Sequence, residues 1–122
     1  MEVKKLNKNF SVCKVRDYSL VNVEGEYVFI GKTDEEKSLV CITEDVPPNT
    51  IQRDDGWMGF RIQGVLDFSL VGILSGISAV LTNHGISIFA VSTYNTDYIF
   101  IKEENYQKAL DILMTSGYTV AD

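Results

Sequence analysis

The fold is decided by residues 86–101, which read ISIFAVSTYNTDYIFI. The first seven residues are mostly β-branched, aromatic or small, which predicts a strand that is buried on much of both faces. The polar residues from Thr93 to Thr96 predict a turn, and Asp97 to Ile101 continue as a second strand. This stretch is therefore expected to form a β-hairpin.

On the N-terminal side of the hairpin, the sequence predicts a strand followed by a helix. Residues 57–63 alternate between apolar and other side chains, which is the pattern of a half-buried strand. We expect Asp67 or Ser69 to cap the start of the helix, and Asn83-His84-Gly85 to end it. Apolar residues at helical spacing predict this helix over residues 69–83, and they are Leu70, Ile73, Leu74, Ile77 and Leu81.

On the C-terminal side, a second amphipathic helix is expected from about Glu103, and Gly117 follows its end. Residues 118–120 can add a last short strand to the sheet. The order strand, helix, strand, strand, helix, strand (βαββαβ) is that of a ferredoxin-like α+β unit, in which both helices cover one face of an antiparallel sheet.

The first part of the chain predicts a smaller region built from strands. Strands are expected at residues 10–15, 26–30 and 38–42, with one helical turn within residues 32–36. Two prolines and an Asp-Gly pair predict a loop over residues 47–56. We therefore expect two domains, residues 1–55 and residues 56–122, of which the first has no room for a long first helix.

Composition excludes several classes of function. The formal net charge of −6, with only 11 Lys and Arg residues, argues against nucleic acid as a partner. Polar residues interrupt the uncharged stretch from Phe68 to Thr96, so we expect neither a membrane span nor a membrane partner.

The N-terminal residues lack the features of a signal peptide, which favours a cytoplasmic location. Cys13 and Cys41 lie far apart in sequence without a CxxC motif, so we expect two apolar strand residues and no metal site.

Three segments carry a resemblance to a known family. Residues 56–64 read GWMGFRIQG, residues 66–74 read LDFSLVGIL and residues 85–99 read GISIFAVSTYNTDYI. With these segments, the chain resembles small proteins of two ACT subdomains, related to the regulatory domains of aspartate kinases and to the animal cytosolic arginine sensor. The resemblance implies an ACT subdomain at residues 56–122, paired with an abridged ACT-like subdomain at residues 1–55.

The same resemblance implies a non-catalytic regulatory protein. ACT subdomains pair side by side and usually bind an amino acid where the turn from first strand to first helix faces a neighbour. This implies an amino-acid ligand, a homodimer, a regulated enzyme or transporter as partner, and no cofactor. The ligand-binding turn would contain Asp67, Phe68, Ser69 and Leu70, and the opposing wall Ile88, Ser92, Thr93 and Asp97.

The residue types of this candidate site suit a zwitterion. The free N–H groups at the start of the first helix can bind a carboxylate, and Asp67 or Asp97 can bind an ammonium group. Each of these residues also has a purely structural interpretation. Asp67 can cap its helix, while Ser92, Thr93 and Asp97 can shape the hairpin turn.

A second class of function stays open. The family's turn commonly carries Gly where this chain has Leu70, so Leu70 and Phe68 could fill the pocket. The chain would then be a structural or protein-interaction module without a ligand, pairing through its sheet edge and the Gly-containing first helix. An enzyme is not expected, because the sequence offers no nucleophile with a base, no phosphate loop and no zinc motif.

Overall fold

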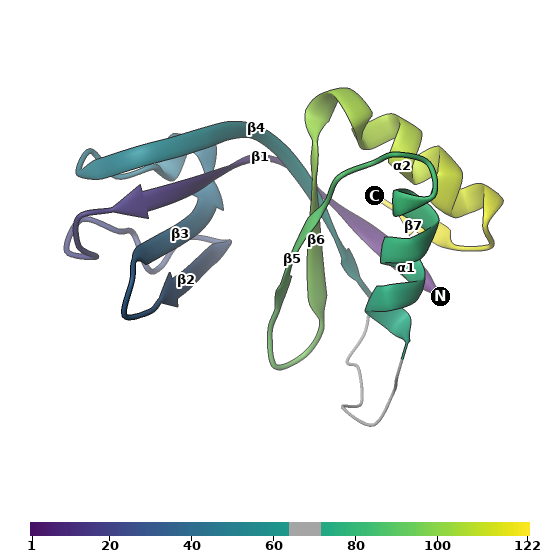
Figure 1. The fold of residues 1–122 in the computed structure, drawn as a ribbon, viewed down its shortest axis with the longest axis horizontal. Coiled ribbons are helices and arrows are strands. Elements are labelled where there is room, and N and C mark those ends of the chain that lie inside the picture. The colour runs from purple at the N-terminus through teal and green to yellow at the C-terminus, as the bar shows by residue number, and fades with distance from the viewer. Residues whose placement is uncertain (64–71) are drawn as a thin grey trace. The chain divides into compact units, whose positions relative to one another are not determined.

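The structure of residues 1–122 is a computed structural model, and it describes residues 1–63 and 72–122 (Figure 1). The backbone forms two compact units. Residues 8–57 make the N-terminal unit, and residues 1–7 together with 58–122 make the C-terminal unit. Two long strands, β1 (Glu2–Val15) and β4 (Thr50–Ile62), contribute residues to both units. The sequence-based division at residue 55 did not assign residues 1–7 to the second unit.

The C-terminal unit has the element order predicted from the sequence. After β4 come α1 (Ile73–Thr82), β5 (Phe89–Ser92), β6 (Asp97–Lys102), α2 (Glu103–Thr115) and β7 (Thr119–Ala121). Its strands lie in the order β7, β1, β4, β6, β5. The N-terminal segment of β1 therefore lies between β7 and β4, which the sequence did not predict. The last strand pairs in parallel with β1, with Glu2 opposite Thr119.

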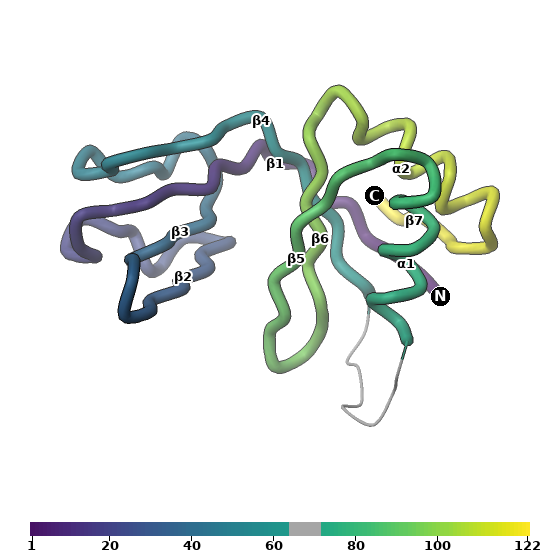
Figure 2. The backbone as a smooth tube through the Cα atoms, viewed as in Figure 1, coloured from purple at the N-terminus to yellow at the C-terminus, as the bar shows by residue number. Residues whose placement is uncertain are grey.

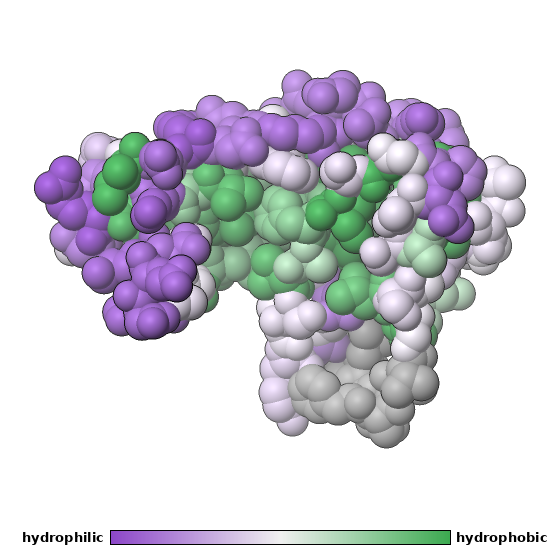
Figure 3. All heavy atoms as spheres, in the orientation of Figure 1, coloured by the Kyte–Doolittle hydropathy of each residue, from purple (hydrophilic) through white to green (hydrophobic). Residues whose placement is uncertain are grey.

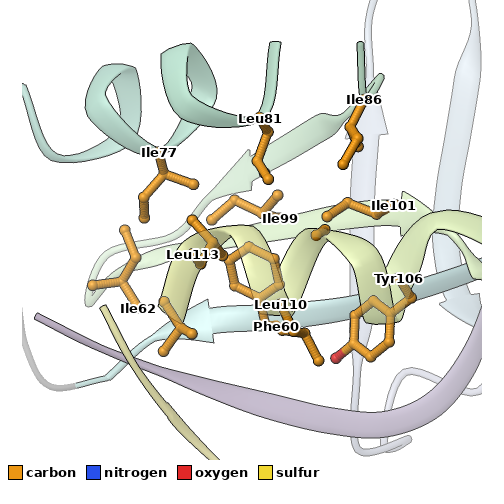
Figure 4. Close-up of a cluster of buried hydrophobic side chains, with 12 residues drawn as sticks. Phe60, Ile62, Ile77, Leu81, Ile86, Ile99, Ile101, Tyr106, Leu110 and Leu113 are labelled. Atoms are coloured by element: carbon orange, nitrogen blue, oxygen red, sulfur yellow. The ribbon is translucent and has the colours of Figure 1, made fainter. Parts of the chain in front are cut away.

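Both helices pack against the same set of strand residues, as predicted. Helix α1 contributes Ile77 and Leu81 to this core, and Phe60 and Ile62 of β4 lie opposite them (Figure 4). Removing these side chains from water is the main favourable contribution to folding of this unit. The strands, the connection from α1 to β5 and α2 supply the other fully or nearly fully buried members, which are Val3, Ile86, Ile99, Ile101, Tyr106, Ala109, Leu110 and Leu113.

The N-terminal unit contains the expected strands. Its strand order is β2 (Val28–Lys32), β3 (Lys37–Ile42), β1, β4, and a single 3-10 turn, η1 (Thr43–Asp45), follows β3. The helical turn predicted within residues 32–36 is wrong, because these residues form a hairpin turn in which the Thr33 N–H donates to the Glu36 carbonyl. The loop predicted over residues 47–56 is also wrong from Thr50 onward, since pairing with β1 makes these charged, exposed residues a strand.

The C-terminal ends of the two helices agree with the sequence. Gly85 and Gly117 have positive φ angles of 74° and 99° and end the two helices as predicted. The described helix α1 begins after Gly72, whereas Asp67 and Ser69, which were predicted to cap it, lie outside the described residues. Strand β5 is at the edge of the sheet, and Ala90 and Ser92 are exposed, so the prediction of burial on both faces is wrong. Within the described residues, neither helix is long and apolar enough to cross a membrane.

Candidate functional site

The candidate site is built around the hairpin that joins β5 to β6. Four residues, Thr93 to Thr96, connect the strands, and Ser92 is paired with Asp97 where they meet (Figure 2). The Thr93 N–H and the Thr93 hydroxyl both donate to the Thr96 carbonyl at 2.9 Å. The Thr96 N–H donates back to the Thr93 hydroxyl at 3.4 Å. These bonds use the polar groups of Thr93 to hold the shape of the turn.

The Ser92 and Asp97 side chains meet directly at the base of this turn. The Ser92 hydroxyl donates a 2.5 Å hydrogen bond to Oδ1 of Asp97. Ser92 is exposed and Asp97 is half-buried, so the carboxylate is fixed in orientation but remains accessible. The tip of the hairpin is pale purple to white in Figure 3, which agrees with its polar and neutral residues. This arrangement can present an oriented negative charge to a ligand.

Thr96 ties the hairpin to the end of β4, and sequence reasoning missed it. Its side chain is only 6% exposed, and its hydroxyl donates to the Ile62 carbonyl at 2.8 Å. Ile62 is the last residue of β4, so this bond holds the hairpin beside the point where the connection from β4 to α1 begins. The only signal in the sequence was a β-branched polar residue between the turn and the second strand.

The structure does not bring all the predicted site residues together. Ile88 precedes β5 and packs, partly buried, against the core beneath the helices. It is four positions before Ser92, which corresponds to about 13 Å of extended chain. Asp67, Phe68, Ser69 and Leu70 lie outside the described residues. Ser92, Thr93 and Asp97 thus form the part of the candidate site that the structure describes.

The start of α1 offers backbone donors of the right polarity. Gly72 has φ 81°, and its carbonyl accepts the first hydrogen bond of the helix, from the Gly76 N–H at 2.8 Å. No acidic side chain lies in the first turn, and the capping residue Gly72 has no side chain that could bond to the free N–H groups. The positive end of the helix dipole therefore remains uncompensated within the described helix.

In residues 1–63 and 72–122, no group of three His, Cys, Asp or Glu side chains could hold a metal ion. His84 lies at the end of α1, where its Nδ1 is 2.9 Å from the Val80 carbonyl. This bond fits the interpretation of His84 as a residue that ends a helix. A cavity of about 210 Å³ beside it is lined by His84, Asp111, Ile112, Thr115 and Ser116.

A family model for the ACT domain matches residues 52–115, just over half of the chain. The chain belongs to the ACT-domain family. The match extends from β4 to the last residue of α2, so it contains both helices and the β5–β6 hairpin. ACT domains are regulatory domains, which supports a regulatory role for this chain. A search of curated proteins gave no significant match.

Solved structures resemble this ACT-domain chain over nearly its whole length. Protein Atu0741 from Agobacterium tumefaciens is 28% identical, with a TM-score of 0.86, and the match covers 98% of this chain and 90% of that one. Protein VC0802 from Vibrio cholerae, of unknown function and described as a possible transport protein, is 20% identical. Its TM-score is 0.72, and the match covers 93% of this chain and 88% of that one.

The regulatory subunit of aspartate kinase from Thermus thermophilus, in its ligand-free form, has a similar fold. It is 10% identical, with a TM-score of 0.63, and the match covers 94% of this chain and 97% of the subunit. At this identity the likeness concerns the fold alone.

Proposed function

We propose that this ACT-domain chain is a non-catalytic regulatory protein that binds an amino acid between the β4–α1 connection and the β5–β6 hairpin. In this arrangement Asp97 binds the ammonium group of the ligand, and the N–H groups at the start of α1 bind its carboxylate. The observation that carries the proposal is the bond from Ser92 to Asp97, which fixes an accessible carboxylate on the hairpin.

The position of this carboxylate supports the assignment. Thr96 fastens the hairpin to the last residue of β4 through its bond to the Ile62 carbonyl. The connection that follows Ile62 leads to Gly72 and the N–H donors at the start of α1. A carboxylate and a set of N–H donors on elements joined in this way are the two recognition groups that a zwitterion requires. Phe68, Ser69, Leu70 and Asp67 belong to this proposed site through the family resemblance.

We further propose that the N-terminal unit is an abridged ACT-like subdomain. Its hairpin resembles the one in the C-terminal unit, since the Thr33 N–H donates to Glu36 and the Thr93 N–H to Thr96, both at 2.9 Å. In each unit the second hairpin strand lies beside a long strand, β1 or β4. In each unit a helical segment directly follows the second hairpin strand. The 3-10 turn η1 follows β3 in the N-terminal unit, and α2 follows β6 in the C-terminal unit.

The same proposal includes a homodimer that acts on an enzyme or a transporter. Strand β5 is at the end of the strand order and carries the exposed residues Ala90 and Ser92. An edge strand has unpaired backbone groups on one side, which suit pairing with another strand. A second copy bound there would lie next to the hairpin that carries Asp97.

Thermal unfolding against the twenty amino acids tests the proposed function. A ligand at about 100 times its dissociation constant stabilises the folded protein by about 2.7 kcal/mol, which raises Tm by several degrees. We expect one amino acid, or a chemically related group, to raise Tm of the wild type and to lose this effect in Asp97→Asn. Asp111→Asn is the matched control, because Asp111 is an exposed aspartate that also accepts a side-chain hydrogen bond.

The second candidate function is an interaction module that binds no small molecule. The observation that favours it is the edge position of β5, which offers a pairing surface without any ligand. Under this alternative no amino acid changes Tm of the protein. Sedimentation equilibrium then shows a dimer for the wild type and a monomer for Ala90→Pro, which disrupts pairing at the edge strand. A ligand-dependent rise in Tm would exclude it.

A further inference from the structure

The two cysteines of the chain meet in the N-terminal unit although 27 residues separate them in sequence. Cys13 lies on β1 and Cys41 on β3, which are antiparallel neighbours. Ser11 pairs with Cys41 and Cys13 pairs with Leu39, so the cysteines occupy diagonal positions on one face. Both belong to one buried cluster, in which Val15 and Leu39 are the other buried members.

The surroundings make the two thiols chemically different. The hydrogen bond from Cys41 lowers the pKa of Cys13, an effect that outweighs its burial and is reinforced by the Arg53 guanidinium. The same hydrogen bond, together with burial, raises the pKa of Cys41. Asp55 partly opposes the effect of Arg53 on Cys13. The pair thus combines a thiol whose pKa is lowered with one whose pKa is raised, the combination found in redox-active dithiols.

We propose that Cys13 and Cys41 form a reversible disulfide, which makes this pair an oxidation site of the chain. The oxidant is a hydroperoxide. The Cys13 thiolate attacks one peroxide oxygen, the O–O bond breaks, and the leaving oxygen is protonated to water. The Cys41 sulfur then attacks the sulfenic acid on Cys13, the S–S bond forms, and the hydroxyl leaves as water with the Cys41 proton. The two thiols lose two electrons, and hydrogen peroxide is reduced to two waters.

Access to the pair depends on the segment between β1 and β2. Cys13 is 3% exposed and Cys41 is 2% exposed, and Tyr18 and Val21 of this segment pack against the cluster that contains both cysteines. A 3.0 Å hydrogen bond from the Tyr18 hydroxyl to the Ser38 carbonyl fastens the segment over the cluster. Local opening of the segment therefore admits a small peroxide, and the reaction proceeds at the rate that this opening allows.

The geometry explains why the bond is expected to be reversible. Diagonal residues of neighbouring strands have Cα atoms about 7–8 Å apart, slightly beyond the usual span of a disulfide. Closing the bond requires a small shift of β1 along β3. A disulfide formed under such strain is reduced more easily than a structural one, so thiols regenerate the dithiol.

Oxidation of the folded wild type tests the proposal. We expect hydrogen peroxide to yield a monomer whose proteolytic digest contains one disulfide-linked peptide with both cysteines, and dithiothreitol to reverse it. Methionine oxidation adds oxygen to other peptides and is thus distinguished. Recovery of both thiols unmodified, under conditions that oxidise the urea-denatured chain, would overturn the proposal. Formation of only intermolecular disulfides or of sulfonic acid would do the same.

Single variants test the assigned order of the two steps. In Cys41→Ser we expect a sulfenic acid on Cys13 that dimedone traps. In Cys13→Ser we expect Cys41 to react at least about tenfold more slowly, because burial and the nearby Asp45 carboxylate still raise the pKa of its thiol. Equal rates in the two variants would contradict the assignment of Cys13 as the attacking sulfur. If either variant fails to fold, the wild-type digest still decides whether the bond forms.

Discussion

The Tyr106 hydroxyl donates a 2.6 Å hydrogen bond to the Gly59 carbonyl in the core of the C-terminal unit. This bond joins the first turn of α2 to the C-terminal part of β4, and it satisfies two polar groups that are removed from water. It therefore helps to fix the position of α2 on the sheet. The strand that it bonds to, β4, ends at Ile62, where the connection that belongs to the proposed ligand site begins.

Removing this hydroxyl should destabilise the protein without creating a large cavity. In Tyr106→Phe the Gly59 carbonyl loses its partner in a buried environment, which costs about 1–3 kcal/mol. Urea unfolding followed by circular dichroism measures the loss as a lower midpoint with an unchanged m-value. Tyr94→Phe, at an 80% exposed position in the hairpin, is the control and should leave the midpoint nearly unchanged. Equal midpoints for Tyr106→Phe and wild type would show that the bond is not formed in solution.

The same residue predicts how stability depends on alkaline pH. Burial raises the pKa of Tyr106 above its ordinary value. Above pH 10 the unfolded chain loses this phenolic proton while the folded chain keeps it, so the folded protein becomes less stable as pH rises. The slope contributed by one such group approaches about 1.4 kcal/mol per pH unit. The unfolding free energy of Tyr106→Phe should decline less steeply between pH 10 and 11, and parallel slopes would refute the assignment.

Gly59 should tolerate no side chain. A Cβ at this position would lie 2.9 Å from Cε1 of Phe100 and 3.0 Å from Cδ1 of Leu6. Gly59→Ala therefore overpacks the core and should cost about 1–3 kcal/mol in the unfolding free energy. Gly31→Ala is the matched strand variant, because its Cβ meets nothing closer than Ser38 Cβ at 3.8 Å. If both variants had the same midpoint in urea, the close approach of Phe100 to β4 would be wrong.

The first residues of the chain should matter to the C-terminal unit. Val3 is fully buried in the core beneath the helices, and β1 lies between β4 and β7 there. Val3→Ala should cost about 2 kcal/mol and accelerate amide hydrogen exchange in α2. Glu2→Ala, at the exposed neighbouring position, should change neither. Unchanged exchange in α2 of Val3→Ala would contradict the placement of β1 in this sheet.

Periodicity was sufficient to predict the elements of the C-terminal unit. Ile77 and Leu81 at helical spacing are fully buried on α1, and the hairpin forms around Thr93 to Thr96 as expected. The pairing partners of the strands were harder to predict than the strands themselves, because the side-chain pattern of a strand does not say which neighbouring strand it bonds to. For that reason the insertion of residues 2–7 beside β7 was missed. The strand at residues 50–56 was missed because its side chains are mostly exposed and include three adjacent charged residues, which resembles a loop.

The candidate site was predictable only in part. Ser92 and Asp97 stood out as polar residues at the ends of a predicted turn, and the structure joins them by a hydrogen bond. Thr96 was missed, because its role depends on the Ile62 carbonyl, which only the folded sheet brings within reach. Asp67 to Leu70 remain a prediction from the family resemblance.

The most direct test of the proposed amino-acid site is calorimetric titration of the amino acid that raises Tm most, into the wild type and Asp97→Asn. A charge-assisted bond from an ammonium group to Asp97 contributes about 2 kcal/mol, so the account predicts about 30-fold weaker binding in the variant. Asp111→Asn should bind as the wild type does. Equal dissociation constants for Asp97→Asn and wild type would contradict the site, and the absence of binding heat for every amino acid would contradict the proposed function itself.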